Sequence, residues 1–238
     1  MNRGALLLSL GSILLMACRS GADLDIAPVP NDVVAFDVLY AQNCAGCHGS
    51  GGKNGAAISL ADPAFLAIAD DAVIRRNVTS GVAGTPMPAF AQSAGGMLTD
   101  RQIDAVVHGI RGWSNARALG GSTPPSYTAL AAGDAQRGVE VYRTYCLSCH
   151  GAEGRGGRAG SIVDGSYLAL VSTQELRMNV ILGRPAQGAP DWRGDVPGKP
   201  MSEQEISDVV AWLEAQRPAT PGQPYPATML HGESGGMR

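Results

Sequence analysis

Bulky aromatic side chains are scarce in this chain of 238 residues, which has only 3 Phe, 3 Trp and 6 Tyr. Its length predicts one large domain or two small ones, each able to bury a core. So few rings leave those cores underfilled, and something other than side chains is expected to occupy part of the interior. With 45% hydrophobic residues, 32 Gly and 15 Pro, the composition is globular and rich in loops.

Positive charge is also limited. The 18 Lys and Arg residues form no cluster, and the formal net charge is −3. A protein that binds a phosphate backbone needs a basic surface, so nucleic-acid binding is not expected. The sequence also has no Ser-His-Asp signature, no Walker loop and no dinucleotide fingerprint. We therefore expect neither catalytic residues nor a small-molecule substrate.

Long apolar runs are absent apart from residues 4–17, a stretch too short to span a membrane. Arg3 precedes this run, as in an export signal, and the run ends in a Leu-Met-Ala-Cys sequence at Cys18. That sequence resembles the lipobox of bacterial lipoproteins, in which the Cys becomes the lipidated first residue. We expect a signal peptide over 1–17 and a lipid-anchored tether over 18–30, which would place the protein on the periplasmic side of a bacterial membrane. A plain secretory signal is the alternative.

The other four cysteines form two five-residue motifs. These are Cys44-Ala-Gly-Cys47-His48 and Cys146-Leu-Ser-Cys149-His150. Each reads C-x-x-C-H, the attachment signature of c-type haem. On one helical turn both thiols can reach the vinyl groups of a porphyrin, and the following His can bind the iron. A thioredoxin-like dithiol or half a zinc site would explain C-x-x-C, but not two copies that both continue with His. The sequence predicts two covalently bound haem c groups, with His48 and His150 as axial ligands.

The motifs belong to a longer internal repeat. Cys146 follows Cys44 by 102 residues, and this offset also aligns Tyr40 with Tyr142. After one added residue in the second copy, Leu98 aligns with Met201. One unit is therefore duplicated, over 31–113 and 133–217, with a linker over 114–132 and a Pro/Gly-rich tail over 218–238.

Helices and loops, without a credible strand pair, are predicted for each unit. A first helix runs into each motif, a middle helix follows the Gly-rich loop, and a last helix begins at a capping residue, Thr99 or Ser202. The expected first helices are 32–43 and 134–145, and the expected middle helices are 70–79 and 172–182. The fold class is all-α.

On these motifs each unit resembles a small class I cytochrome c domain, and the whole chain resembles a dihaem cytochrome c lipoprotein. The resemblance implies an all-α fold of two tandem domains, each wrapped around one covalent haem, with the first and last helices packed together. It also implies transfer of single electrons. A porphyrin in each core would account for the missing aromatic residues.

The sixth iron ligand distinguishes the two copies. In this family it is commonly a Met in a loop before the last helix, and Met87, between Pro86 and Pro88, fits that pattern. The equivalent position in the second copy holds Ala189, which cannot bind iron. Met201 is the nearest spare thioether, but it aligns with Leu98, a packing position. Ligation by Met201 and an open second iron both remain as interpretations.

The function expected from these features is electron transfer between a respiratory or dehydrogenase donor and an oxidase-type acceptor, both of them redox proteins. Because Met ligation raises the potential, the first haem should be the higher-potential centre. Two alternatives remain. One is a dihaem enzyme or sensor that binds peroxide or a gas at the second haem. The other is a fixed cytochrome subunit of a larger respiratory complex.

A large and a small residue occupy equivalent positions of the two copies in opposite order. The first helices carry Phe36 and Gly138, and the last helices carry Gly109 and Trp212. Close approach of two helices leaves room for one ring at their crossing. We therefore expect Phe36 to meet Gly109, and Gly138 to meet Trp212.

Overall fold

The computed structural model describes residues 30–194, 196 and 198–219. These residues form α-helices and short 3-10 helices joined by loops, and among them no β-strand is present. The all-α prediction is confirmed. None of the helices in this described part is long and apolar enough to cross a membrane. The predicted signal peptide, Cys18, the tether up to residue 29 and the tail from residue 220 lie outside the described residues.

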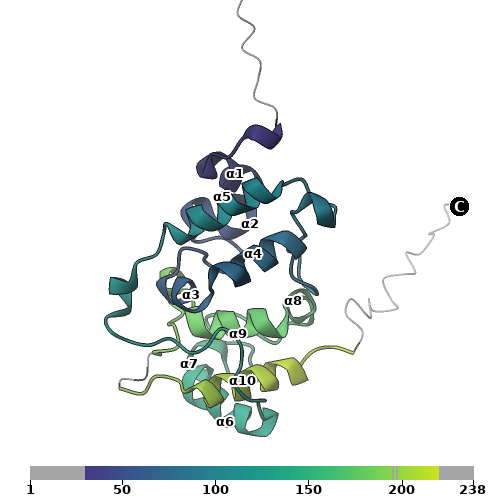
Figure 1. Ribbon diagram of the computed structural model, residues 1–238. Coiled ribbons are helices and arrows are strands. Elements are labelled where there is room, and N and C mark those ends of the chain that lie inside the picture. The colour runs from purple at the N-terminus through teal and green to yellow at the C-terminus, as the bar shows by residue number, and fades with distance from the viewer. Residues whose placement is uncertain (1–29, 195, 197, 220–238) are drawn as a thin grey trace, which may run out of the picture.

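The two halves of the chain repeat the same order of helices (Figure 1). The first unit contains α1 (Phe36–Asn43), α2 (Ala45–His48), α3 (Pro63–Ile68), α4 (Asp71–Ser80) and α5 (Asp100–Arg111). The second contains α6 (Ala135–Tyr145), α7 (Leu147–His150), α8 (Gly165–Leu170), α9 (Thr173–Leu182) and α10 (Glu203–Ala215). In each unit the last helix packs against the first and against the middle one.

Side-chain caps begin most of the longer helices. Thr99 and Ser202 each complete a capping box at the start of the last helix, with Gln102 and Glu205 as the reciprocal partners. The short helices α3 and α8 were not expected from the sequence. They begin at Asp62 and Asp164, whose carboxylates accept hydrogen bonds from two backbone N–H groups each. Apart from these capping residues, the sequence gives little indication of the two helices, because each has only six residues.

The first helix begins later than the sequence pattern indicated. The pattern predicted a start at Asp32, but α1 begins at Phe36, and the segment Pro30–Asp32 is a separate 3-10 helix. The cause is a tertiary contact, because the Gln102 amide donates hydrogen bonds to the carbonyls of Pro30 and Val33, both at 2.9 Å. Because Gln102 lies in α5, both carbonyls are bound to α5 instead of extending α1 towards its N-terminus.

The predicted packing pairs are confirmed. A methyl group added at Gly109 would lie 2.1 Å from ring carbons of Phe36, and one added at Gly138 would lie 2.7 Å from Cβ of Trp212. Only glycine allows the helices to approach so closely. The first and last helices of each unit therefore cross as expected. The glycine lies on the last helix in the first unit and on the first helix in the second unit.

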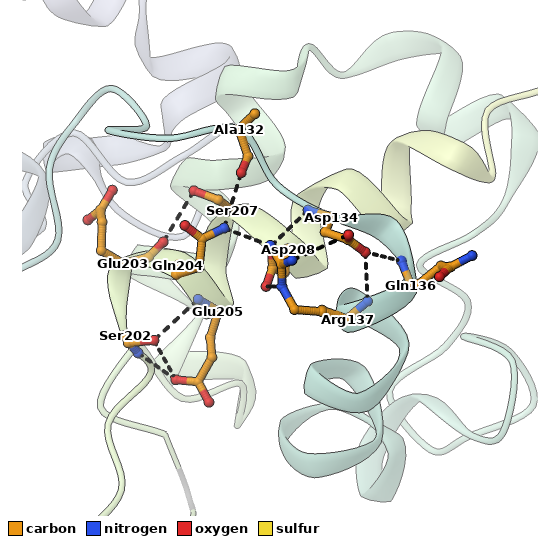
Figure 2. A network of polar contacts seen from close by, with 10 residues as sticks. All are labelled: Ala132, Asp134, Gln136, Arg137, Ser202, Glu203, Gln204, Glu205, Ser207 and Asp208. Atoms are coloured by element: carbon orange, nitrogen blue, oxygen red, sulfur yellow. Dashed lines mark hydrogen bonds and ion pairs between the residues drawn. The ribbon is translucent and has the colours of Figure 1, made fainter.

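A polar network fastens α6 to α10 in the second unit (Figure 2). The buried Asp208 carboxylate accepts hydrogen bonds from Nε and Nη2 of Arg137, at 2.8 and 2.9 Å. It also accepts from the backbone N–H of Asp134 at 2.7 Å and the Gln204 amide at 2.8 Å. The positions equivalent to Arg137 and Asp208 in the first unit are both alanine, so this network belongs to the second unit alone.

Acid should weaken the second unit through this network. The hydrogen bonds from Arg137 hold the pKa of Asp208 below its ordinary value, although burial acts in the opposite direction. A carboxyl whose pKa is lower in the folded state stabilises the fold above its unfolded pKa, and this contribution is lost as the pH falls through the folded pKa. We therefore expect the free energy of unfolding to decline below about pH 4, as measured by urea unfolding at neutral and acidic pH. Asp208→Asn should flatten that decline, and an equally steep decline in the variant would contradict the assignment.

Candidate haem sites

The last four residues of each C-x-x-C-H motif form a short helix that directly follows the first helix of its unit. Cys44 separates α1 from α2, and Cys146 separates α6 from α7. The loop after each motif returns to it in the same way. The backbone N–H of Ala57 donates to the carbonyl of Cys47, and that of Ala159 donates to the carbonyl of Cys149, both at 2.9 Å. The two cysteines of each motif are thus held on one turn by equivalent local contacts.

Both motif histidines have one ring nitrogen held by a backbone carbonyl. Nδ1 of His48 donates to the carbonyl of Ile58 at 2.8 Å, and Nδ1 of His150 donates to that of Gly160 at 3.0 Å. A carbonyl only accepts hydrogen bonds, so the proton lies on Nδ1 and the Nε2 lone pair is available to a metal. Burial lowers the pKa of His48, which favours the neutral imidazole that binds iron.

A tyrosine fixes the turn that leaves each motif. The hydroxyl of Tyr40 donates to the carbonyl of Gly49 at 2.9 Å, and that of Tyr142 donates to the carbonyl of Gly151 at 2.5 Å. Gly49 and Gly151 have φ angles of 80° and 84°, and a Cβ on Gly49 would lie 1.8 Å from the Lys53 carbonyl oxygen. These tyrosine contacts were not predicted, although the alignment of Tyr40 with Tyr142 was the available signal.

Met87 lies half-buried in a loop that is closed by its own backbone. Its carbonyl accepts from the N–H of Val82 at 3.1 Å, and its N–H donates to the Thr85 hydroxyl at 3.2 Å. Gly81 permits this closure, because a Cβ there would lie 2.7 Å from the Met87 carbonyl oxygen. The side chain packs against the apolar core of the molecule.

The second unit places Ala189 where the first unit has Met87. The Ala189 carbonyl accepts from the N–H of Arg184 at 2.9 Å, which repeats the bond between Val82 and Met87. Gly183 closes the loop as Gly81 does, since a Cβ there would lie 2.8 Å from the Ala189 carbonyl oxygen. The backbone of the loop is therefore kept, and the thioether is replaced by a methyl group.

Met201 lies at the position that Leu98 has in the first unit. The N–H of Leu98 donates to the carbonyl of Phe90, and the N–H of Met201 donates to that of Trp192, both at 2.7 Å. Leu98 is 4% exposed and Met201 is 7% exposed. The backbone hydrogen bonds therefore agree with the alignment of Leu98 and Met201. Met201 is buried in the same way as Leu98, an apolar residue with no ligand role.

The donor set in each unit suits a covalently attached haem. Two thiols lie on one turn beside an imidazole whose Nδ1 proton is already bound, which leaves Nε2 for iron. The first unit adds the soft thioether of Met87. The second unit offers no equivalent side chain at Ala189. The residues present therefore fit two haem c groups, and the two units differ in the side chain at the Met87 position.

Comparison with known proteins supports this interpretation. The family described as cytochrome c oxidase, cbb3-type, subunit III matches residues 32–108 and 133–213. The chain is 33% identical over 134 residues to the cbb3-type cytochrome c oxidase subunit CcoP of Azospirillum sp. (strain B510), which covers 52% of this chain and 40% of that protein. It is 30% identical over 142 residues to the subunit FixP of Azorhizobium caulinodans, which covers 55% of this chain and 43% of that protein.

The chain thus spans less than half the length of these curated relatives. Among solved structures, a chain of the Kuenenia stuttgartiensis reducing HAO-like protein complex matches with a TM-score of 0.46 and 19% identity, over 80% of this chain and 99% of that one.

The matched segments cover most of both predicted units and the whole of both motifs. The protein is accordingly a dihaem c-type cytochrome with two covalently bound haem c groups. By the extent of this match, the chain belongs to the family of cbb3-type cytochrome c oxidase subunit III.

Proposed function

We propose that this cytochrome relays single electrons from a respiratory or dehydrogenase donor to an oxidase-type acceptor. The observation that carries the proposal is the repeated histidine geometry, in which His48 and His150 are held through Nδ1 by equivalent backbone carbonyls. A bound haem c stores one electron by changing between ferric and ferrous iron. The similarity to CcoP and FixP, which are subunits of an oxidase, favours an oxidase as the acceptor. Mixing the reduced protein with a cbb3-type oxidase should reoxidise both haems, and failure to do so would contradict this acceptor.

We further propose the residues that hold the two groups. Cys44 and Cys47 form the thioether bonds of the first haem, and Cys146 and Cys149 form those of the second. His48, Met87 and His150 are axial ligands, with Met201 as a candidate for the remaining position. The domains are 31–113 and 133–217, and a lipid on Cys18 anchors the chain on the periplasmic side of the membrane.

The two haems should differ in potential, because only the first unit has a thioether at the ligand position. Met ligation favours the ferrous state and raises the potential. Electrons move towards higher potential, so the second haem receives them and the first haem passes them on. A redox titration that gave the second haem the higher potential would overturn this direction.

Ala189→Met tests the inequality directly. The backbone at Ala189 already follows that at Met87, so the new thioether should reach the ligand position. We expect the second haem to gain the Met-to-iron charge-transfer band and a higher potential. Two equal His/Met signals in the wild-type protein would contradict an empty position at Ala189. If Met201→Ala then removed one of those two signals, Met201 would be identified as the replacement ligand.

Ligand binding at the second haem is a second candidate function, and the methyl group of Ala189 in place of a thioether is the observation that favours it. A sixth position without a protein ligand can bind a diatomic gas or peroxide. Reduced wild-type protein should then bind carbon monoxide rapidly at one haem, and Ala189→Met should abolish this binding. If neither haem binds carbon monoxide, the protein is an electron carrier only.

A further inference from the structure

The segment between the two units is held by the second unit. Arg177 of α9 donates from Nε and Nη2 to the carbonyl of Ser126, at 3.1 and 2.8 Å, and from Nε to the carbonyl of Tyr127 at 3.2 Å. The backbone N–H of Ser126 donates to the Glu203 carboxylate at 3.1 Å. Glu203 is also the ion-pair partner of Arg177. One buried guanidinium and one carboxylate therefore enclose Ser126 and Tyr127.

The equivalent arginine of the first unit has a different role. Arg75 aligns with Arg177, yet its side chain is 42% exposed and pairs with Asp104 on the neighbouring helix α5. The side chain of Arg177 is 3% exposed. Among the described residues, its Nη1 is the one buried side-chain nitrogen or oxygen without a hydrogen-bond partner. Burying such a group is unfavourable, so the bonds to the linker and to Glu203 must offset this cost.

Tyr127 is held by both units at once. Its hydroxyl accepts a hydrogen bond from the Asn77 amide of α4 at 3.1 Å, and its carbonyl accepts from the Gln174 amide of α9 at 2.7 Å. The first contact belongs to the first unit and the second to the second unit. The linker residue is therefore a bridge between two helices that the sequence places nearly a hundred residues apart.

The two units also share an apolar core. α3 packs against α9, and Figure 1 shows α9 between the helices of the first unit and α10. Met178, Ile181 and Leu182 of α9 are buried in the same apolar cluster as Phe65 and Leu66 of α3. The residues of α4 that align with these three are Arg76, Thr79 and Ser80. α9 has thus acquired an apolar face that α4 lacks, as expected of a helix with a second packing partner.

Arg184 adds a polar contact across the same boundary. Its guanidinium donates to the carbonyls of Gly55 and Ala56, at 3.3 and 2.6 Å. These carbonyls lie in the loop that follows the first haem motif. The second unit therefore contacts the first beside its haem-binding segment as well as at the linker.

We infer that Arg177 is a positioning residue that, through Ser126 and Tyr127, holds the two haem domains in one orientation, so that electrons pass between the haems over a fixed separation. The inference rests on the proposed relay between the two haems. It matters for the relay because electron tunnelling becomes slower as the distance between redox centres grows. A linker that let the domains rotate would make this rate vary from one molecule to the next.

Arg177→Lys tests the inference in the dihaem protein. Lysine keeps the positive charge beside Glu203 but loses the planar fork that binds two carbonyls and a carboxylate together. Pulsed EPR between the two ferric haems should give one narrow distance distribution in the wild-type protein and a broad one in the variant. The rate of electron exchange between the haems should lose its single-exponential form. Arg75→Lys, at the equivalent exposed position, is the matched control and should leave both measurements unchanged.

A second variant keeps the test informative even if the Arg177→Lys protein does not fold. Tyr127→Phe removes only the hydrogen bond from Asn77, and it should broaden the distance distribution less than Arg177→Lys does. A broad distribution in the wild-type protein would overturn the inference. It would also be overturned if the distribution stayed narrow in both variants. The haem potentials and the effect of Ala189→Met on them test the relay separately, because neither depends on the angle between the domains.

Discussion

Replacing Met87 by alanine should lower the potential of the first haem strongly. Axial ligands set haem potentials over a span of about 0.8 V, so we expect a decrease of more than about 0.1 V. The physical reason is the loss of a soft thioether that favours ferrous iron. The charge-transfer band between Met and iron should disappear together with the higher potential. A redox titration followed by the absorption of each haem measures both effects, and the first haem should then resemble the second.

Met97 provides the control for this prediction. It is a methionine before the same last helix of the first unit, but its side chain points to solvent and is 73% exposed. Met97→Ala should therefore leave the potential and the charge-transfer band of the first haem unchanged. If Met87→Ala also left them unchanged, Met87 would not be the ligand and the proposed direction of electron flow would lose its basis.

Gly138→Ala should destabilise the second unit by about 1–3 kcal/mol, the usual cost of overpacking a close-packed site. The added methyl group would lie 2.2 Å from the backbone carbonyl oxygen of Asp208 and 2.7 Å from Cβ of Trp212. A backbone oxygen cannot rotate away as a side chain can, so α6 and α10 must separate. This separation outweighs the gain of about 1 kcal/mol in helix propensity that alanine brings. Urea unfolding of the dihaem protein, followed by circular dichroism, measures the change.

Gly165→Ala is the matched control. Gly165 also lies within a helix of the second unit, but a methyl group there would meet only Pro218, at 3.5 Å, which is an ordinary van der Waals contact. We expect this variant to be as stable as the wild-type protein or slightly more so. Equal losses of stability in the two variants would contradict the assignment of the loss to the crossing of α6 and α10.

Local patterns determined much of this protein. The C-x-x-C-H motifs and the constant offset between the copies indicated the two haem sites. The offset also indicated the correspondence of Ala189 with Met87, which the backbone hydrogen bonds follow. The start of each last helix was equally clear, because Thr99 and Ser202 cap it with a partner three residues away. The motifs and helix caps depend only on residues within one helical turn, and the repeat is found by aligning the two halves of the chain.

Tertiary structure decided what those patterns could not show. Asp32 was expected to begin a helix, but Gln102 takes the carbonyls of Pro30 and Val33. The stretch from 114 to 132 has the composition of a flexible linker, and yet Arg177 binds it at Ser126 and Tyr127. Arg75 and Arg177 are the same residue type at equivalent positions of the two copies and differ only in their surroundings. No local sequence pattern therefore distinguishes their roles. The reason is physical: burial of a charged group depends on which distant carbonyls and carboxylates reach it, and that is set only when the two units pack together.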